Sequence, residues 1–149
     1  MNAEIYTERM LEVVNQLTFD KELKISDIER LLNIKMHDVN HEDPFMPGKV
    51  NFTVYEWKSL EKNTPLAGVT ARKYSEKTPG WGIISIELSS DNPIPWDNAL
   101  SYKYGEKQGI SPDAGGRLVS IRYQVGSSTV SFSKKRDADY LHDIVINRN

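Results

Sequence analysis

The sequence predicts a single α+β domain in which two N-terminal helices pack on one face of a largely antiparallel sheet of about five or six strands. Apolar residues recur at helical spacing in the first third of the chain. Most of the remaining chain shows the alternation of polar and apolar residues that is typical of strands. Helices followed by consecutive strands favour an antiparallel sheet that is covered on one side. A length of 149 residues suits one domain, 1–149, with a substantial core.

The first predicted helix covers residues 3–17. Its apolar residues fall on one helical face, and they are Tyr6, Met10, Val13, Val14 and Leu17. Acidic residues occupy the other faces, so the helix is amphipathic and we expect its apolar face to cover the sheet.

The second predicted helix, within residues 25–36, carries end signals. Ser26 is the expected N-cap, because Glu29 lies three residues later in a capping-box arrangement. Asn33 tolerates the left-handed conformation and is the expected C-terminal stop. An apolar stripe joins these ends, and it consists of Ile28, Leu31 and Leu32.

Strands are expected after this helix pair, and 50–57 is the first. There we expect Val50, Phe52 and Val54 on one face and Tyr55 and Trp57 on the other, with Trp57 at a strand end or pointing outward. The further strands are predicted at 67–74, 82–89, 117–125 and 129–133, the last two joined by a turn at 126–128. The final segment, 140–146, fits either a strand or a short helix.

Residues 90–116 form an irregular segment that is rich in proline and glycine, with a possible short helix over 97–104. A segment of this size inside a compact domain is either functional or mobile. Its aromatic and acidic side chains are the type found at protein-binding hot spots. The predicted partner-binding residues are therefore Trp96, Asp97, Tyr102 and Tyr104. The alternative is that Trp96 packs the segment onto the sheet.

Composition argues against several classes of function. The 19 basic and 21 acidic residues give a net charge of −2, which argues against nucleic acid as the main partner. The basic run 134–136 is expected to be a solvated turn. Without cysteine there are no disulfides, thiolate nucleophiles or cysteine-ligated zinc sites. No apolar run is long enough to span a membrane, and no signal peptide is visible, which leaves the cytoplasm or the periplasm as the expected location.

Few residues suggest catalysis or metal binding. His37 and His41 lie close to two acids, but this segment precedes Pro44 and fits a solvated loop better than a rigid metal site. His142 lies near Asp139 and Asp143, yet no nucleophilic serine motif accompanies it. We therefore predict no catalytic residues, no metal and no cofactor.

The run Lys24-Ile25-Ser26-Asp27-Ile28-Glu29-Arg30-Leu31-Leu32-Asn33 and the layout of residues 23–57 resemble the small domains of β-lactamase inhibitor proteins and outer-membrane-assembly lipoproteins. The resemblance implies a noncatalytic protein-binding module, often in the bacterial envelope. The resulting hypothesis is an inhibitor or immunity protein that neutralises a bacterial toxin, effector or enzyme by occlusion. The alternatives are a small envelope assembly module, or a small enzyme or ligand carrier with a cavity between helices and sheet. The sequence leaves the oligomeric state open.

Overall fold

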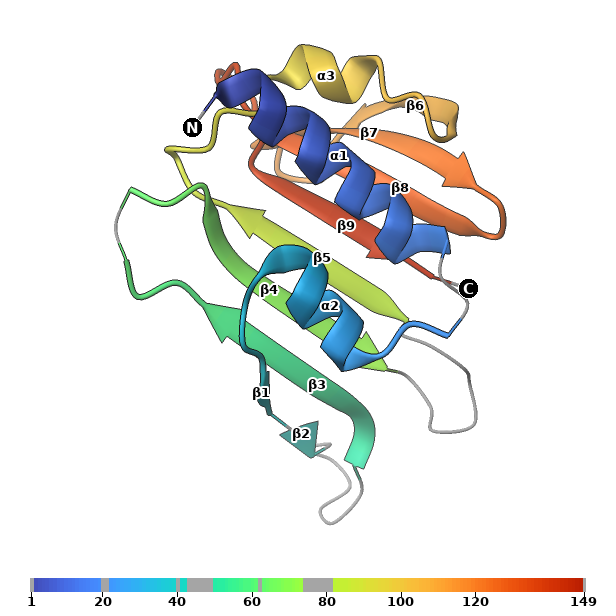
Figure 1. The fold of residues 1–149 in the computed structure, drawn as a ribbon. Coiled ribbons are helices and arrows are strands. Elements are labelled where there is room, and N and C mark those ends of the chain that lie inside the picture. Colours follow the sequence, from blue (N-terminus) through green and yellow to red (C-terminus); the bar gives the residue numbers. More distant parts are fainter. Residues whose placement is uncertain are drawn as a thin grey trace.

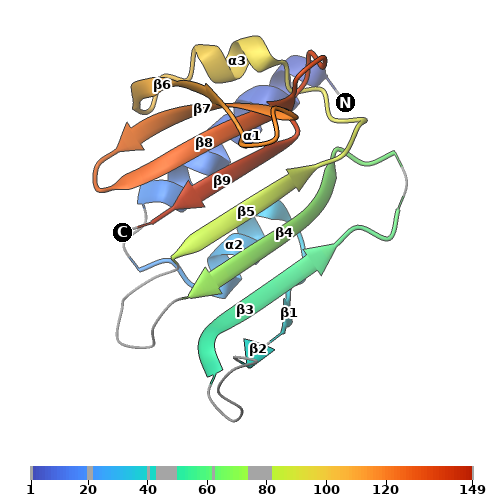
Figure 2. The same cartoon turned by 180° about the vertical axis from the view of Figure 1, so that it is seen from behind.

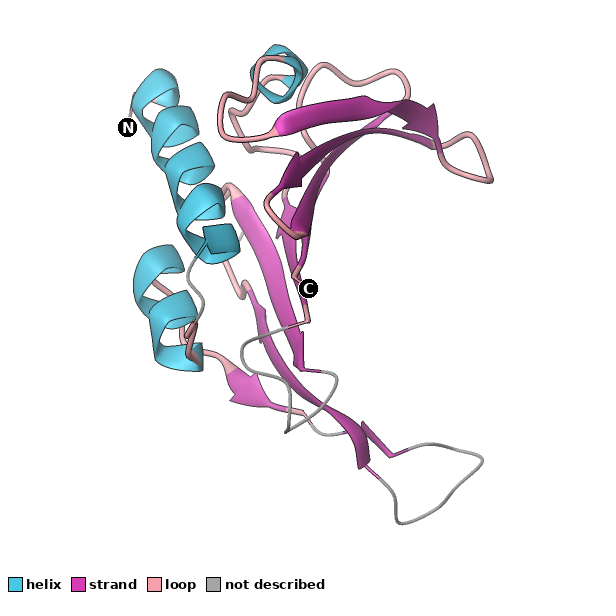
Figure 3. Cartoon of the chain, turned by 90° about the vertical axis from the view of Figure 1, so that its right-hand side faces the viewer, coloured by secondary structure: helices cyan, strands magenta, loops and turns pink. Residues whose placement is uncertain are grey.

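A computed structural model describes residues 2–19, 22–39, 41–42, 50–61, 63–73 and 82–148. Helices α1 (Ala3–Phe19) and α2 (Ile25–Leu32) lie on one face of a single sheet, α1 in front of β8 and β9 and α2 in front of β4 and β5 (Figure 1). In the described part of the chain, no helix covers the opposite face (Figure 2), and the side view separates the two layers (Figure 3). No helix among these residues has the length and apolarity that crossing a membrane requires.

The sheet is antiparallel throughout. Its strands are β1 (His37–Asp38), β2 (His41–Glu42), β3 (Val50–Lys58), β4 (Leu66–Lys73), β5 (Ile83–Leu88), β6 (Glu106–Pro112), β7 (Leu118–Val125), β8 (Ser128–Lys135) and β9 (Asp143–Asn147). They follow the order β1-β3-β4-β5-β9-β8-β7-β6, and β2 also pairs with β3. The α+β class and the antiparallel sheet are confirmed, but the predicted count of five or six strands is too low.

The additional strands lie where local sequence signals are weak. β1 and β2 are two-residue strands that pair with the outer side of β3. β6 follows the short helix α3 (Trp96–Leu100), inside the segment expected to be irregular. Every residue of β6 is exposed, and its pairing with β7 is interrupted between Lys107 and Gly109. A strand without a buried face has no hydrophobic alternation, which explains why the sequence did not indicate it.

The last element of the chain is the strand β9, which lies between β5 and β8. It joins two antiparallel groups, β3-β4-β5 and β6-β7-β8, into one sheet. Ile144 pairs with Ile86 on one side and with Phe132 on the other, and all three side chains are fully buried. Of the two structures that fitted residues 140–146, the strand is the one observed.

Where β3 is described, Val54 and the pair Tyr55 and Trp57 lie on the two predicted faces, but Trp57 does not point outward. The side chains of Val50 and Phe52 lie outside the described residues. Tyr55 pairs with Ala71 and Trp57 pairs with Val69, and directly paired residues of antiparallel strands share a face. Ala71 and Val69 belong to the core between the helices and the sheet. Tyr55 and Trp57 therefore lie on the helix side of the sheet and pack against this core. Val54 is buried on the opposite face. Alternation identifies two faces of a strand, but it does not say which one the helices cover.

The ends of α2 confirm one predicted signal and correct the other. Asn33 adopts the left-handed conformation with φ 55°, as expected, and the next amide, that of Ile34, donates to the Glu29 carbonyl at 3.0 Å. The N-cap, however, is Lys24, whose amide donates to Asp27 Oδ2 at 2.9 Å. Ser26 lies inside the first turn, because the helix begins one residue before it.

Asn92 holds the connection from β5 to α3 against the sheet. Its side-chain amide donates to the carbonyl groups of Ser89 and Leu141 at 2.8 and 2.7 Å. Its Oδ1 accepts a hydrogen bond from the Ile94 amide at 3.0 Å. Only 4% of Asn92 is exposed, so these bonds satisfy a buried polar side chain and link the connection to the segment before β9.

We predict that Asn92→Ala lowers the free energy of unfolding by about 2–4 kcal/mol, because it leaves buried backbone groups without partners. Urea denaturation followed by circular dichroism measures this change. Asn147→Ala is the control, since Asn147 is exposed in β9, and it should change stability by less than about 0.5 kcal/mol. Equal effects of the two substitutions would contradict the role of Asn92.

Candidate functional site

The chain segment between β8 and β9 is held from several directions. Lys134 Nζ donates to the carbonyl groups of Arg136 and Ala138 at 3.1 and 3.0 Å. The Ala138 amide donates to the Lys135 carbonyl at 3.0 Å. At its far end, the Leu141 amide donates to the Ile94 carbonyl at 2.9 Å. These bonds give the β8–β9 loop, residues 136–142, a defined shape before any ligand binds.

The same loop pairs with the start of α3. Pro95 and Tyr140 form an isolated antiparallel bridge, and the Trp96 amide donates to the Asp139 carbonyl at 2.9 Å. Lys134 Nζ lies 5.7 Å from the centre of the Trp96 ring, within the range of a cation–π contact. Two aromatic residues that are distant in sequence, Trp96 and Tyr140, are thereby brought to one place on the molecule.

The structure separates the four residues predicted to bind a partner. Trp96 is half-buried at the first position of α3, and Asp97 beside it is exposed. Tyr104 is half-buried, with Lys103 Nζ 5.3 Å from its ring centre. Tyr102 is only 5% exposed and belongs to the core. Trp96, Asp97 and Tyr104 therefore have surface to offer a partner, whereas Tyr102 does not.

Tyr102 is buried in a cluster of aromatic rings. Its ring makes edge-to-face contacts with Tyr104, Tyr123 and Phe132, at centroid distances of 5.5, 5.2 and 4.9 Å. Burial raises the pKa of its hydroxyl well above the ordinary tyrosine value, and Tyr104 and Tyr123 add to the increase. The hydroxyl has no hydrogen-bond partner in the described part of the chain. An aromatic residue in an irregular segment fits a core or a binding surface equally well. Composition therefore did not distinguish the buried Tyr102 from the accessible aromatic residues of the same segment.

Tyr140 is the surface residue that the sequence reasoning missed. It is 50% exposed and lies next to Trp96 through the bridge to Pro95. Asp139 and Asp97, both exposed, add negative charge nearby. We call Trp96, Asp97, Asp139 and Tyr140 the aromatic surface. No local pattern marks Tyr140, because its position depends on pairing with a segment about 45 residues earlier.

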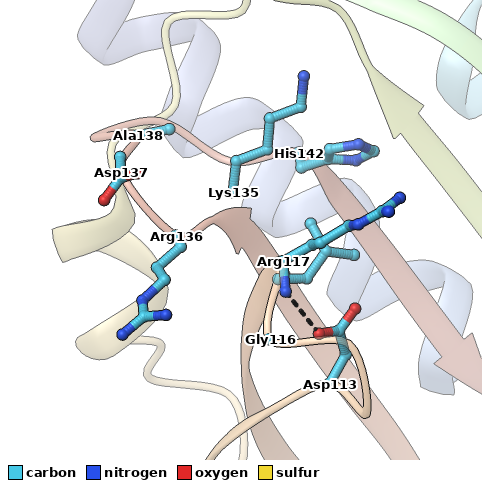
Figure 4. Close-up of a pocket in the computed structure, with 9 residues that line it drawn as sticks. Asp113, Gly116, Arg117, Lys135, Arg136, Asp137, Ala138 and His142 are labelled. Atoms are coloured by element: carbon cyan, nitrogen blue, oxygen red, sulfur yellow. Dashed lines mark hydrogen bonds between the residues drawn. The ribbon is translucent and has the colours of Figure 1, made fainter.

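The same loop lines part of a pocket of about 670 Å³ (Figure 4). The residues that line it are Asp113, Gly116, Arg117, Leu118, Lys135, Arg136, Asp137, Ala138 and His142. They come from the β6–β7 loop, the start of β7, the end of β8 and the β8–β9 loop. This loop pocket lies at the ends of strands, whereas the predicted cavity was between helices and sheet.

Pairing of β7 with β8 brings positive charges together in the loop pocket. Leu118 is opposite Lys135, and the Arg136 amide donates to the Arg117 carbonyl at 2.9 Å. Asp113 Oδ1 accepts a hydrogen bond from the Arg117 amide at 2.8 Å and so shapes the β6–β7 loop. Two residues of the run 134–136, which was expected to be a solvated turn, thus line the pocket with Arg117 from another loop, and they are Lys135 and Arg136.

A polar network continues from the loop pocket across the uncovered face of the sheet. His142 Nδ1 lies 3.4 Å from Asp143 Oδ2, without the alignment of a hydrogen bond. On its other side, Asp143 forms a hydrogen bond with the side chain of Ser133. Ser133 Oγ in turn lies 2.7 Å from Ser120 Oγ. Burial raises the pKa of the Asp143 carboxyl, and Glu87 adds to this, while Ser133 and His142 oppose it. The carboxylate lies between serine and histidine, which is not the order that activates a serine nucleophile.

The remaining candidate, the histidine pair, falls partly outside the described residues. His37 is exposed in β1, but the side chain of His41 and residues 43–49 are not described. Among the described residues, no three His, Asp or Glu side chains are grouped as metal ligands. The His37–His41 pair therefore stays a sequence-based hypothesis.

Comparisons with known proteins do not assign the chain to a family: no protein-family model, curated protein or solved structure matches it significantly.

We predict opposite outcomes for two neighbouring hydroxyl groups. Tyr102→Phe should leave stability unchanged or raise it by up to about 1 kcal/mol, because it removes a buried hydroxyl without a partner. Tyr123→Phe should lower it by about 1 kcal/mol, because the Tyr123 hydroxyl donates to the Ala99 carbonyl at 2.5 Å. Urea denaturation of both variants measures the difference, and the reverse order would contradict the observed burial.

We also predict a pH-dependent effect at Asp143. Its raised folded-state pKa means that its contribution to stability is present below the unfolded aspartate pKa of about 4 and is lost as pH rises through the folded value. The stability of Asp143→Asn relative to wild type should therefore increase as the pH rises from about 3 to about 7. Urea denaturation across this range tests the direction. The control Ser131→Ala introduces no change in titrating groups, so its difference from wild type should not vary with pH.

Proposed function

We propose that this chain is a noncatalytic protein-binding domain of the inhibitor or immunity-protein type. Its partner is a bacterial toxin, effector or enzyme in the cytoplasm or periplasm, which it neutralises by occlusion. The observation that carries the proposal is the aromatic surface, where backbone pairing places Trp96 at the start of α3 beside the loop that carries the exposed Tyr140.

The aromatic surface has the features that favour protein binding. Tryptophan and tyrosine are enriched among residues that dominate binding energy. The loop is already ordered by Lys134 and by the Trp96–Asp139 hydrogen bond, which lowers the entropy lost on binding. Exposed Asp97 and Asp139 favour a partner with basic residues opposite them.

The exposed edge of the sheet favours binding through side chains over addition of a strand. β6 is the edge strand next to β7 and is exposed along its whole length. It carries a pairing irregularity at Gly109, where φ is 145°, a lysine at 107, and Pro112, which has no amide to donate. Irregular pairing, lysine and proline are the devices by which proteins discourage pairing at sheet edges.

The loop pocket supports a second candidate function, that of a ligand carrier or small enzyme. Its volume of about 670 Å³ lies within the range of small-molecule sites. The third alternative, an envelope assembly module, is supported by the sequence resemblance of residues 23–57.

We predict that Trp96→Ala combined with Tyr140→Ala weakens capture of the partner by at least about 30-fold, the effect expected when a hot spot of two or more kcal/mol is removed. The measurement is quantitative pull-down from a lysate of the organism that encodes the chain, followed by titration of the captured protein.

Phe19→Ala is the matched control, because Phe19 is an exposed aromatic residue at the end of α1, away from the aromatic surface. It should leave capture unchanged. Circular dichroism establishes that both variants are folded. Equal capture by wild type and the double variant would refute the aromatic surface as the binding site.

A further inference from the structure

The loop pocket gathers cations that the sequence places in two separate turns. Arg117 precedes β7 and Lys135 ends β8, and the ladder between these strands keeps them adjacent. Figure 4 shows the side chains of Arg117, Lys135 and His142 on the same side of the pocket, whereas those of Arg136 and Asp137 extend to the other side. The cluster is therefore a product of strand pairing, and it is independent of the aromatic surface.

Among the described residues, the structure shows no negative partner for these cations. Within the part of the chain that the structure describes, no carboxylate lies within 4.0 Å of a side-chain nitrogen of Arg117, Lys135 or Arg136. The lining contains two acids, Asp113 and Asp137. Asp113 uses its Oδ1 to accept a hydrogen bond from the Arg117 amide, and the side chain of Asp137 extends to the other side of the pocket (Figure 4). Two unpaired cations in one concave site favour an anion, since each provides charged hydrogen-bond donors.

The other lining groups suit an anion that belongs to a small molecule. His142 contacts Asp143 through Nδ1, which leaves Nε2 available as a further polar group. Leu118 and Ala138 supply apolar surface beside the cations. The pocket volume of about 670 Å³ exceeds what a single oxyanion needs and is within the range of organic ligands.

We propose that the loop pocket binds a phosphate group, with Arg117 and Lys135 as its direct ligands and His142 as an additional contact. The planar guanidinium of Arg117 presents paired donors that match two phosphate oxygens, and the Lys135 ammonium supplies a second charge. Phosphate fits better than carboxylate, because a dianion neutralises both cations. The group is carried by a small organic molecule or is free phosphate, and the experiment separates the two.

The test is titration of the full chain with phenyl phosphate and with inorganic phosphate at low ionic strength, followed by amide chemical shifts. Shifts should concentrate at residues 113–118 and 135–142. Arg117→Gln and Lys135→Gln should each weaken binding about 10-fold, the effect of losing one charged hydrogen-bonding group. Tighter binding of phenyl phosphate identifies an organic phosphate, and equal affinities identify free phosphate.

Arg122→Gln is the matched control, because it removes one positive charge from an exposed position of β7 outside the pocket. It should leave the affinity unchanged. Arg117→Lys, which keeps the charge, should retain part of the binding. Absence of binding at millimolar phosphate, or an equal loss in Arg122→Gln, would overturn the proposal. Substitution of Trp96 and Tyr140 should not change phosphate affinity, so this result and that of the partner test are independent.

Discussion

The insertion of β9 between β5 and β8 is the constraint on which the rest of the structure depends. Without it, each group of three strands would have an unpaired inner edge. Ile144 and Ile146 are fully buried in this strand, and burying a side chain of this kind contributes about 1.5–3 kcal/mol. Arg148 then donates to the Leu17 carbonyl at 2.7 Å, which ties the end of α1 to the end of the sheet. The helix layer and both halves of the sheet are therefore joined by the last residues of the chain.

The same insertion creates both candidate sites. To place β9 beside β8, the chain must return from Lys135 to Asp143 through a short loop. Asp139 and Tyr140 of this loop pair with the start of α3 in the aromatic surface, whereas residues 136–138 and 142 line the loop pocket together with the β6–β7 loop. Lys134 holds the loop at the aromatic surface, since its ammonium donates to loop carbonyls and lies over the Trp96 ring. Both sites therefore include residues of the β8–β9 loop, and a ligand bound at either site can contact this loop.

Sequence reasoning succeeded where local physics controls the outcome. The apolar face of α1, the left-handed stop at Asn33 and the β7–β8 hairpin were all predicted, because each depends on neighbours within a few residues. It failed where neighbours are distant. Trp57 faces the helices through its pairing with Val69, and Tyr102 enters an aromatic cluster with Phe132.

By itself, the sequence determined the α+β class, the helix pair, the antiparallel sheet and the absence of cysteine chemistry, since composition and short-range periodicity carry this information. Only the tertiary structure decided the place of β9, the burial of Tyr102, the pairing of the start of α3 with the segment at Tyr140, and the cluster of Arg117 with Lys135. The physical reason is strand register: antiparallel pairing sets which residues lie opposite one another, and it brings together side chains that no short window of sequence contains.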